Sequence, residues 1–116
     1  IVAIGHLVWE SLVAAAELEK EGISCEVINI HTIKPLDEEI IINSVKKTGK
    51  IVTAEEHNIL GGLGESVARV LAQKCPTKQV FVLFNDTFGE SGTPAELMKK
   101  YKIDSNAVIE KVKSLL

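Results

Sequence analysis

The sequence predicts a three-layer α/β/α fold, in which a doubly wound and mostly parallel sheet lies between two layers of helices. Apolar runs alternate with amphipathic segments along the whole chain, and the connections between them are short. The runs are apolar at consecutive positions rather than at every second position, as expected of strands that are buried on both faces of a parallel sheet. Together these observations predict an α/β domain.

The composition indicates one globular domain. The chain has 116 residues, of which 46% are hydrophobic and 25% are charged, which suits a single hydrophobic core. Its net charge of −3 and the lack of a basic stripe argue against binding to nucleic acid. No apolar run approaches the roughly 20 residues that cross a bilayer. Cys25 and Cys75 are far apart without metal-ligand spacing, which predicts a reducing compartment and a cytoplasmic protein.

Four strands are predicted over 1–5, 25–30, 50–55 and 79–84. Right-handed crossovers between them give the strand order 2-1-3-4. In doubly wound sheets ligands gather at the carboxyl ends of the strands, so functional residues are expected at that edge.

The first helix is expected over 8–21 and ends at Gly22. Five apolar residues are predicted to form its buried side: Val8, Leu12, Ala15, Ala16 and Leu18. The second helix is expected over 37–48, where Asp37 is a favourable N-cap and Gly49 ends the helix.

The third helix is expected over 64–75 and stops before Pro76. Two further helices are expected to close the chain. The segment Thr93–Glu96 is a capping box with proline at the first helical position, and Asp104 or Ser105 is expected to begin the last helix.

Three histidines follow predicted strands: His6 after the first, His31 after the second and His57 after the third. In the order 2-1-3 these strands are neighbours, about 5 Å apart. With Glu55 or Glu56 they could form a metal site, they could face an active site or an interface, or they could be polar simply because the core ends there. The residues alone leave all three interpretations open.

The segment Gly61–Gly64 reads GGLG and connects the third strand to a helix. Its spacing and its position after the third strand fit neither a dinucleotide fingerprint nor a phosphate-binding P-loop. The glycines could permit positive φ and close packing of helix on sheet. Alternatively, the free N–H groups of the helix could meet an anion or another backbone ligand. No nucleophile with a neighbouring base is evident in the chain.

Four motifs occur in register along the chain: TIKPLD at 32–37, VTAEEH at 52–57, GGLGE at 61–65 and SGTPAEL at 91–97. In this order and spacing they resemble the C-terminal domain of the transketolase family, over nearly the whole chain. The same domain type closes 1-deoxyxylulose-5-phosphate synthase and the β subunit of 2-oxoacid dehydrogenases, which are therefore alternatives. An independent module that binds an anion or a nucleotide over Gly61–Gly64 is a further alternative.

The resemblance implies that residues 1–116 are a single domain of a longer chain, with one further antiparallel strand before Ile1. The parent enzyme, a transferase of the pentose phosphate pathway, would use thiamine diphosphate and Mg²⁺ to transfer a two-carbon ketol unit between sugar phosphates. The cofactor would lie between a diphosphate-binding and a pyrimidine-binding domain at a homodimer interface. This chain would contain neither domain, and the isolated fragment would be inactive.

The resemblance also places the candidate site residues. It assigns no catalytic, cofactor-binding or metal-binding residue to this chain. Many relatives lack histidine at the positions of His6 and His31, which argues against a shared three-histidine site. The EEH and GGLG motifs correspond to family positions at the carboxyl edge that faces neighbouring domains. Six residues are therefore expected to face an interface or the active site, with His57 the foremost: Glu55, Glu56, His57, Gly61, Gly62 and Gly64.

Overall fold

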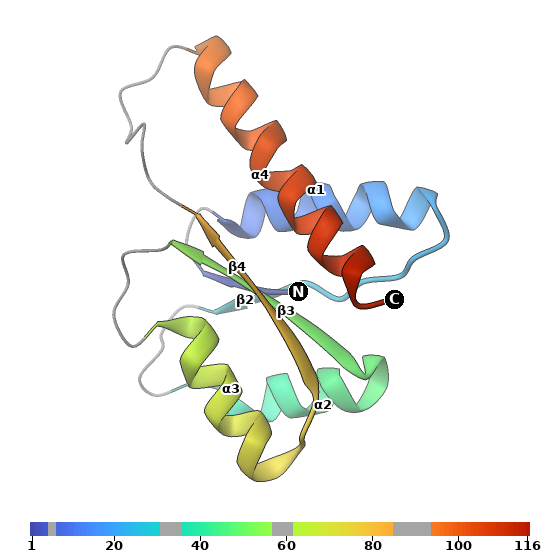
Figure 1. Cartoon of the computed structure of the whole chain (residues 1–116), viewed down its shortest axis with the longest axis vertical. Coiled ribbons are helices and arrows are strands. Elements are labelled where there is room, and N and C mark those ends of the chain that lie inside the picture. Colours follow the sequence, from blue (N-terminus) through green and yellow to red (C-terminus); the bar gives the residue numbers. More distant parts are fainter. Residues whose placement is uncertain (5–6, 31–35, 57–61, 85–93) are drawn as a thin grey trace.

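The computed structural model describes residues 1–4, 7–30, 36–56, 62–84 and 94–116. Strands and helices alternate along these residues (Figure 1), as the sequence predicts. In chain order the elements are β1 (Val2–Ile4), α1 (Leu7–Lys20), β2 (Ile28–Ile30), α2 (Glu38–Thr48), β3 (Lys50–Glu56), α3 (Leu63–Lys74), β4 (Lys78–Phe84) and α4 (Pro94–Ser114).

The strands form one sheet in the order β2-β1-β3-β4, and every neighbouring pair is parallel. The register places Thr53 beside Val2 on one side and beside Phe81 on the other. The predicted fold class and strand order are thereby confirmed. The additional antiparallel strand that the resemblance implies would precede Ile1 and stays a prediction.

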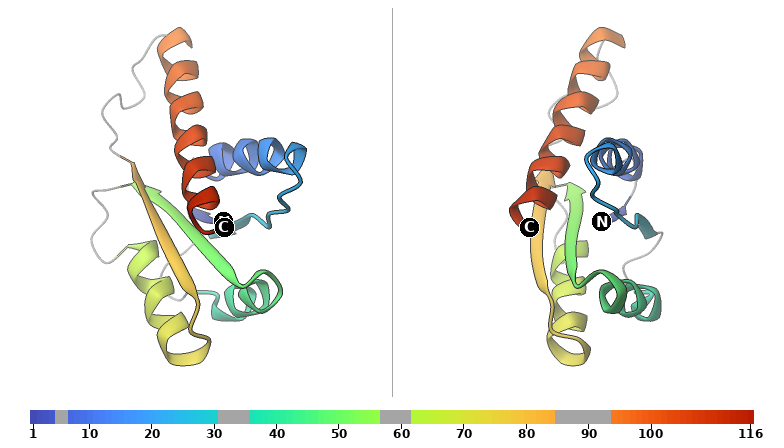
Figure 2. Two further views of the ribbon diagram at one scale, coloured as in Figure 1. Left: turned by 45° about the vertical axis from the view of Figure 1, so that its right-hand side comes forward. Right: turned by 90° about the vertical axis from the view of Figure 1, so that its right-hand side faces the viewer.

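Helices cover both faces of the sheet, with α1 and α4 on one face and α2 and α3 on the other (Figures 1 and 2). Two apolar clusters result. Ala3 and Val52 belong to the cluster under α1 and α4, whereas Val2 and Ile51 belong to the cluster under α2 and α3. Because neighbouring residues of a strand point to opposite faces, the consecutive apolar residues of β1 and β3 serve both clusters.

Helix α1 lies in its predicted place, but the predicted rotation about its axis is wrong. The residues that it buries are Leu7, Glu10, Ser11, Ala14 and Leu18. Of the five residues predicted to be buried, only Leu18 is, while Leu12 is 49% exposed. The helix carries apolar residues on opposite sides, so periodicity alone cannot decide which side faces the sheet.

The predicted ends of α2 are confirmed. The carboxylate of Asp37 accepts a hydrogen bond from the backbone N–H of Ile40 at 3.3 Å, and Gly49 takes the left-handed conformation with φ of 78°. Gly22 has a φ of 83° beyond the end of α1, as expected for a helix stop.

The end of the chain forms one helix where two were expected. Helix α4 begins at Pro94, as predicted, but continues through Asp104 and Ser105 to Ser114. Both of these residues are buried within the helix instead of capping a new one. No glycine or proline interrupts the sequence after Pro94, so nothing in the backbone chemistry requires a break. The sequence also predicts a buried stripe of Val108, Ile109, Val112 and Leu115 in this part of the chain; three of these residues are buried, whereas Ile109 is half-buried.

Among the described residues, no helix combines the length and the apolar character that crossing a membrane requires.

Candidate functional site at the carboxyl edge of the sheet

The side chain of Glu55 caps helix α3 from the neighbouring strand. Glu55 lies near the end of β3 with 4% of its surface exposed, and its Oε2 accepts a hydrogen bond from the backbone N–H of Gly64. The N-cap residue of α3 is Gly62, which has no side chain to supply this acceptor. The buried carboxylate therefore takes the place of an N-cap side chain, and its negative charge lies at the positive end of the helix.

Gln79 on β4 also binds Gly64, at its backbone carbonyl group. Its Nε2 donates to the carbonyl oxygen of Gly64 at 3.0 Å and to Oγ1 of Thr53 at 3.1 Å. Thr53 is completely buried on β3. Glu55 and Gln79 thus fix both peptide groups of Gly64, so the start of α3 is tied to two adjacent strands.

Gly64 is required here by close packing. A Cβ atom at this position would lie 2.5 Å from Cδ2 of Phe81 and 2.8 Å from Oε2 of Glu55. Both distances are far shorter than a van der Waals contact between such atoms. The absence of a side chain at Gly64 lets α3 approach β3 and β4 closely enough for the Glu55 hydrogen bond to form.

These contacts support the packing interpretation of the GGLG segment for the two glycines that the structure describes. Gly62 has an extended conformation with φ of −72°, and positive φ among the described glycines is restricted to Gly22 and Gly49. Of the two properties that glycine could supply here, close packing and not positive φ therefore applies to Gly62 and Gly64. The Gly64 N–H already donates to the carboxylate of Glu55, so it is not available to bind an external anion.

The six candidate residues divide into two groups. Glu55, Gly62 and Gly64 come together at the start of α3 and are buried. The backbone of Glu56 is the last of β3, whereas its side chain, His57 and Gly61 lie outside the described residues, as do His6 and His31. That the candidates face a neighbouring domain stays a prediction. Among the described residues no three His, Cys, Asp or Glu side chains gather as metal ligands would.

Sequence reasoning missed Gln79, Thr53 and Phe81 as parts of this arrangement. One signal was available: Gln79 and Thr53 are polar residues inside runs predicted to be buried on both faces. Such residues must find hydrogen-bond partners within the fold.

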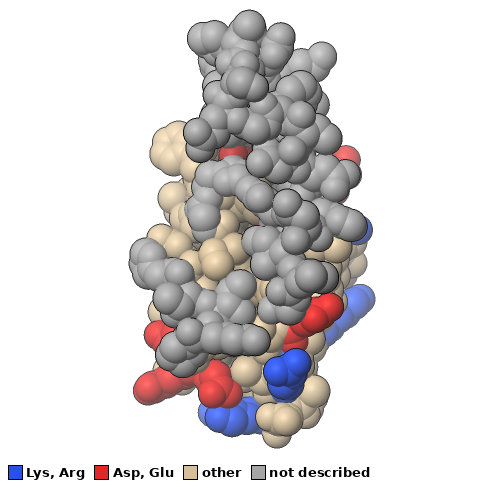
Figure 3. Space-filling model, turned by 90° about the vertical axis from the view of Figure 1, so that its left-hand side faces the viewer, with Lys and Arg blue, Asp and Glu red and all other residues tan. Residues whose placement is uncertain are grey.

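Figure 3 faces the left-hand side of Figure 1, toward which β3 and β4 run. Acidic and basic side chains of the described residues lie close together in the lower part of this view, over the layer of α2 and α3. Mixed charges of this kind differ from the single-sign surfaces that attract polyanions.

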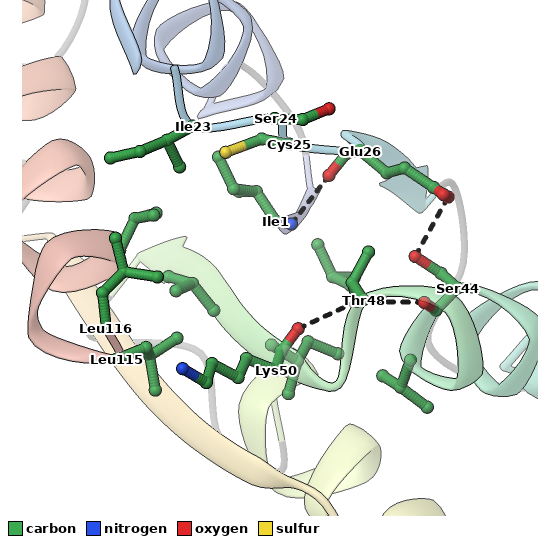
Figure 4. Close-up of a pocket in the computed structure, with 15 residues that line it drawn as sticks. Ile1, Ile23, Ser24, Cys25, Glu26, Ser44, Thr48, Lys50, Leu115 and Leu116 are labelled. Carbon is green, nitrogen blue, oxygen red and sulfur yellow. Dashed lines mark hydrogen bonds between the residues drawn. The ribbon is translucent and has the colours of Figure 1, made fainter. Parts of the chain in front are cut away.

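A pocket of about 110 Å³ lies at the opposite, amino edge of the sheet (Figure 4). Its polar groups are largely paired with one another. The Ile1 amino group donates to the carbonyl of Glu26 at 2.8 Å, and the hydroxyl of Thr48 lies 2.9 Å from the carbonyl of Ser44 and 3.2 Å from that of Lys50. Burial raises the pKa of the Cys25 thiol in the pocket wall, which disfavours the nucleophilic thiolate. The pocket therefore shows no arrangement for covalent catalysis.

Glu26 forms an ion pair at the rim of this pocket. Lys47 Nζ lies 3.2 Å from its Oε2, and Ser44 Oγ donates to its Oε1 at 3.2 Å. The hydrogen bond from Lys47 is the main reason why the pKa of Glu26 is lowered, and Ser44 adds to it. A lowered pKa means that the pair stabilises the fold above the ordinary glutamate pKa and that this stabilisation is lost as the pH falls through the lowered value.

Replacing Lys47 with methionine is accordingly expected to raise the pKa of Glu26 toward its ordinary value. An NMR titration that follows the side-chain carboxyl carbon of Glu26 measures the shift directly. Lys46→Met is the matched control, because Lys46 neighbours Lys47 on α2 and does not contribute to the lowered pKa. Equal Glu26 titration curves for the unchanged chain and Lys47→Met would contradict the assignment.

Comparison with known proteins gives one family over nearly the whole chain. The family model described as "Transketolase, C-terminal domain" matches residues 1–108. A 6-deoxy-6-sulfo-D-fructose transketolase subunit from a Clostridium species (strain MSTE9) is 42% identical over 109 residues, which are 94% of this chain and 34% of the relative. Transketolase from Mus musculus is 38% identical over 117 aligned residues, covering 100% of this chain and 19% of the relative. The chain thus spans 34% and 19% of the length of these two relatives.

A solved structure has the same fold. It is described as a split gene transketolase in an inactive β4 tetramer, and it superposes with a TM-score of 0.80 at 43% sequence identity. The alignment covers 97% of this chain and 37% of that chain.

Proposed function

Because the chain belongs to the transketolase C-terminal domain family, we propose that it is the C-terminal domain of a transketolase-like enzyme. The parent enzyme moves a two-carbon ketol unit from a ketose phosphate to an aldose phosphate. The observation that carries the proposal is the family match over residues 1–108, together with the relatives that are named transketolases. Residues 1–116 form a single domain of the longer chain.

Within this proposal the domain has a structural and interface role. Thiamine diphosphate and Mg²⁺ belong to the diphosphate-binding and pyrimidine-binding domains of the parent enzyme, a cytoplasmic homodimer. One feature of the described residues supports this division: the N-terminus of α3 is capped internally by Glu55, so the Gly64 N–H is not available to a diphosphate. No step of the reaction is assigned to the described residues.

The carboxyl edge is the part of the domain that we propose faces its neighbours. Glu55 and Gln79 fix Gly64, and through it the end of the GGLG segment. Glu56 and His57 follow Glu55 directly in the sequence. The hydrogen bonds to Gly64 thus hold the end of β3 and the start of α3 together. The candidate contact residues Glu56, His57 and Gly61 lie between these two points in the sequence.

Two measurements test the proposal. Calorimetric titration of the 116-residue chain with thiamine diphosphate and Mg²⁺ is expected to give no binding heat. The parent enzyme is expected to transfer a ketol unit between sugar phosphates, and a sulfosugar donor belongs in the same assay because one relative is named for such a substrate. Tight cofactor binding by the chain alone would contradict the division of roles.

The activity assay also separates the related enzymes. A parent enzyme that forms 1-deoxyxylulose 5-phosphate, or that supports 2-oxoacid oxidation, and transfers no ketol unit would assign the domain to one of those enzymes instead.

A further inference from the structure

The pocket at the amino edge of the sheet reaches both apolar clusters of the domain. Val52, Val112 and Leu115 line it from the cluster under α1 and α4, and Val45 and Ile51 line it from the cluster under α2 and α3. Its volume is about 110 Å³. Because an aliphatic cavity of about 150 Å³ holds a benzene molecule, this pocket has room for an apolar group of about four or five carbon atoms.

Two charged side chains line the pocket, Glu26 and Lys50, and they differ in their partners. The carboxylate of Glu26 is bound by Lys47 and Ser44, and in Figure 4 it points toward Ser44. The side chain of Lys50 extends toward Leu115, which also lines the pocket (Figure 4). Among the described residues no carboxylate forms an ion pair with Lys50. An apolar pocket thus has an unpaired positive charge in its lining.

The register of the sheet places a second lysine beside the first. Lys50 and Lys78 are direct partners at the starts of the parallel strands β3 and β4. Neighbouring strands are about 4.8 Å apart, and like charges at paired positions repel each other. Lys78 also forms no ion pair within the described part of the chain. A negative charge next to Lys50 would offset this repulsion, so the edge is electrostatically complementary to an anion.

We propose that the pocket binds a short aliphatic monocarboxylate. The alkyl chain lies against Val52, Val112 and Leu115, and the carboxylate accepts a hydrogen bond from Nζ of Lys50. Sites for small molecules combine apolar walls with a few polar groups that fix the orientation of the ligand, and this pocket offers both. The Ile1 amino group is less suited to the carboxylate, because it already donates to the carbonyl of Glu26 at 2.8 Å and burial lowers its pKa. The proposal does not depend on the enzymatic activity of the parent enzyme.

Pentanoate is the probe that tests the proposal. A ligand of about seven heavy atoms is expected to bind the 116-residue chain with a dissociation constant of about 1 mM. NMR titration up to about 20 mM pentanoate measures this constant. Nuclear Overhauser effects between the alkyl chain and the methyl groups of Val112 and Leu115 are expected to locate the ligand in the pocket.

Two related compounds separate the contributions of charge and apolar surface. Pentanamide keeps the shape of the acid but lacks its charge, so it should bind about fivefold more weakly, as expected for the loss of a partly exposed ion pair. Acetate keeps the charge but lacks most of the alkyl chain, so its binding should be weaker by more than about tenfold.

Replacing Lys50 with methionine should weaken pentanoate binding about fivefold and remove the preference for pentanoate over pentanamide. Lys50 is exposed, so this variant is expected to fold. Lys46→Met is the matched control, because Lys46 is an exposed lysine at the end of α2 that does not line the pocket. It makes the same change in net charge and should leave binding unchanged. Val112→Phe fills the pocket and should abolish binding, with circular dichroism as the check of its fold.

Four results would overturn the proposal. The first is the absence of Overhauser effects from pentanoate to the pocket residues of the unchanged chain at about 20 mM. The second is equal binding of pentanoate and pentanamide. The third is equal binding of pentanoate to Lys50→Met and Lys46→Met, which would mean that Lys50 does not recognise the carboxylate. The fourth is undiminished binding to a folded Val112→Phe variant.

Discussion

Replacing Gly64 with valine is expected to lower the free energy of unfolding by about 3 kcal/mol, as overpacking of a closely packed site does. The new Cβ would lie 2.5 Å from Phe81 Cδ2 and 2.8 Å from Glu55 Oε2, so at least one of these groups must move. Phe81 is 39% exposed and its ring can turn toward solvent. Glu55 is buried and bonded to the Gly64 N–H, so its displacement also costs the capping hydrogen bond of α3.

Urea denaturation followed by circular dichroism measures this change. Gly64→Ala should show a smaller loss, since alanine adds one carbon and favours the helix more than glycine does. Combining Gly64→Val with Phe81→Leu removes the aromatic ring from the contact and should recover part of the stability. If the double variant is as unstable as the sum of the two single ones, Phe81 is not the group that opposes the added side chain.

The arrangement of strands was predictable because it depends on features that a sequence displays directly. Consecutive β-branched and aliphatic residues in 50–55 are required wherever a strand is buried on both faces, and β3 is buried in this way. Short connections and right-handed crossovers then leave little choice of strand order. Caps such as Asp37 and Gly49 act within a few residues, so their chemistry is also visible locally.

The rotation of α1 and the length of α4 were not predictable in the same way. Helix α1 is apolar on two opposite sides, and only contact with the sheet and α4 decides that Leu7 and Ala14 turn inward while Trp9 turns outward. In α4, Asp104 and Ser105 have the composition of a helix start, yet both are buried within a continuous helix. Local propensity is a weak prior that tertiary packing overrides at such positions.

The candidate site was likewise predictable only in part. The sequence identified Glu55 and the GGLG segment as important, but not that the two are bonded to each other. That contact joins residues nine positions apart in the sequence and depends on the depth to which α3 packs on the sheet. Gln79 and Phe81 come from a different strand again, and only the register of β3 against β4 brings them to Gly64. Long-range contacts of this kind do not leave a periodic pattern in one sequence.

Replacing Glu55 with alanine is expected to lower the free energy of unfolding by about 2 to 4 kcal/mol. The variant removes most of a buried side chain and leaves the N–H of Gly64 in a buried setting without its acceptor. It also removes the negative charge at the N-terminus of α3, where Gly62 can supply no replacement. The loss should therefore exceed that of an ordinary N-cap substitution, which is about 1 kcal/mol.

Glu55→Gln separates these contributions, because glutamine keeps the size and an oxygen acceptor but lacks the charge. Its loss should be about 1 kcal/mol, the typical magnitude of a charge at a helix end. Glu65→Ala is the matched control on the same turn, since Glu65 is exposed and should change stability by less than about 0.5 kcal/mol. A Glu55→Ala variant as stable as Glu65→Ala would mean that the buried carboxylate does not hold α3. In that case the proposed presentation of the carboxyl edge to neighbouring domains would lose its structural basis.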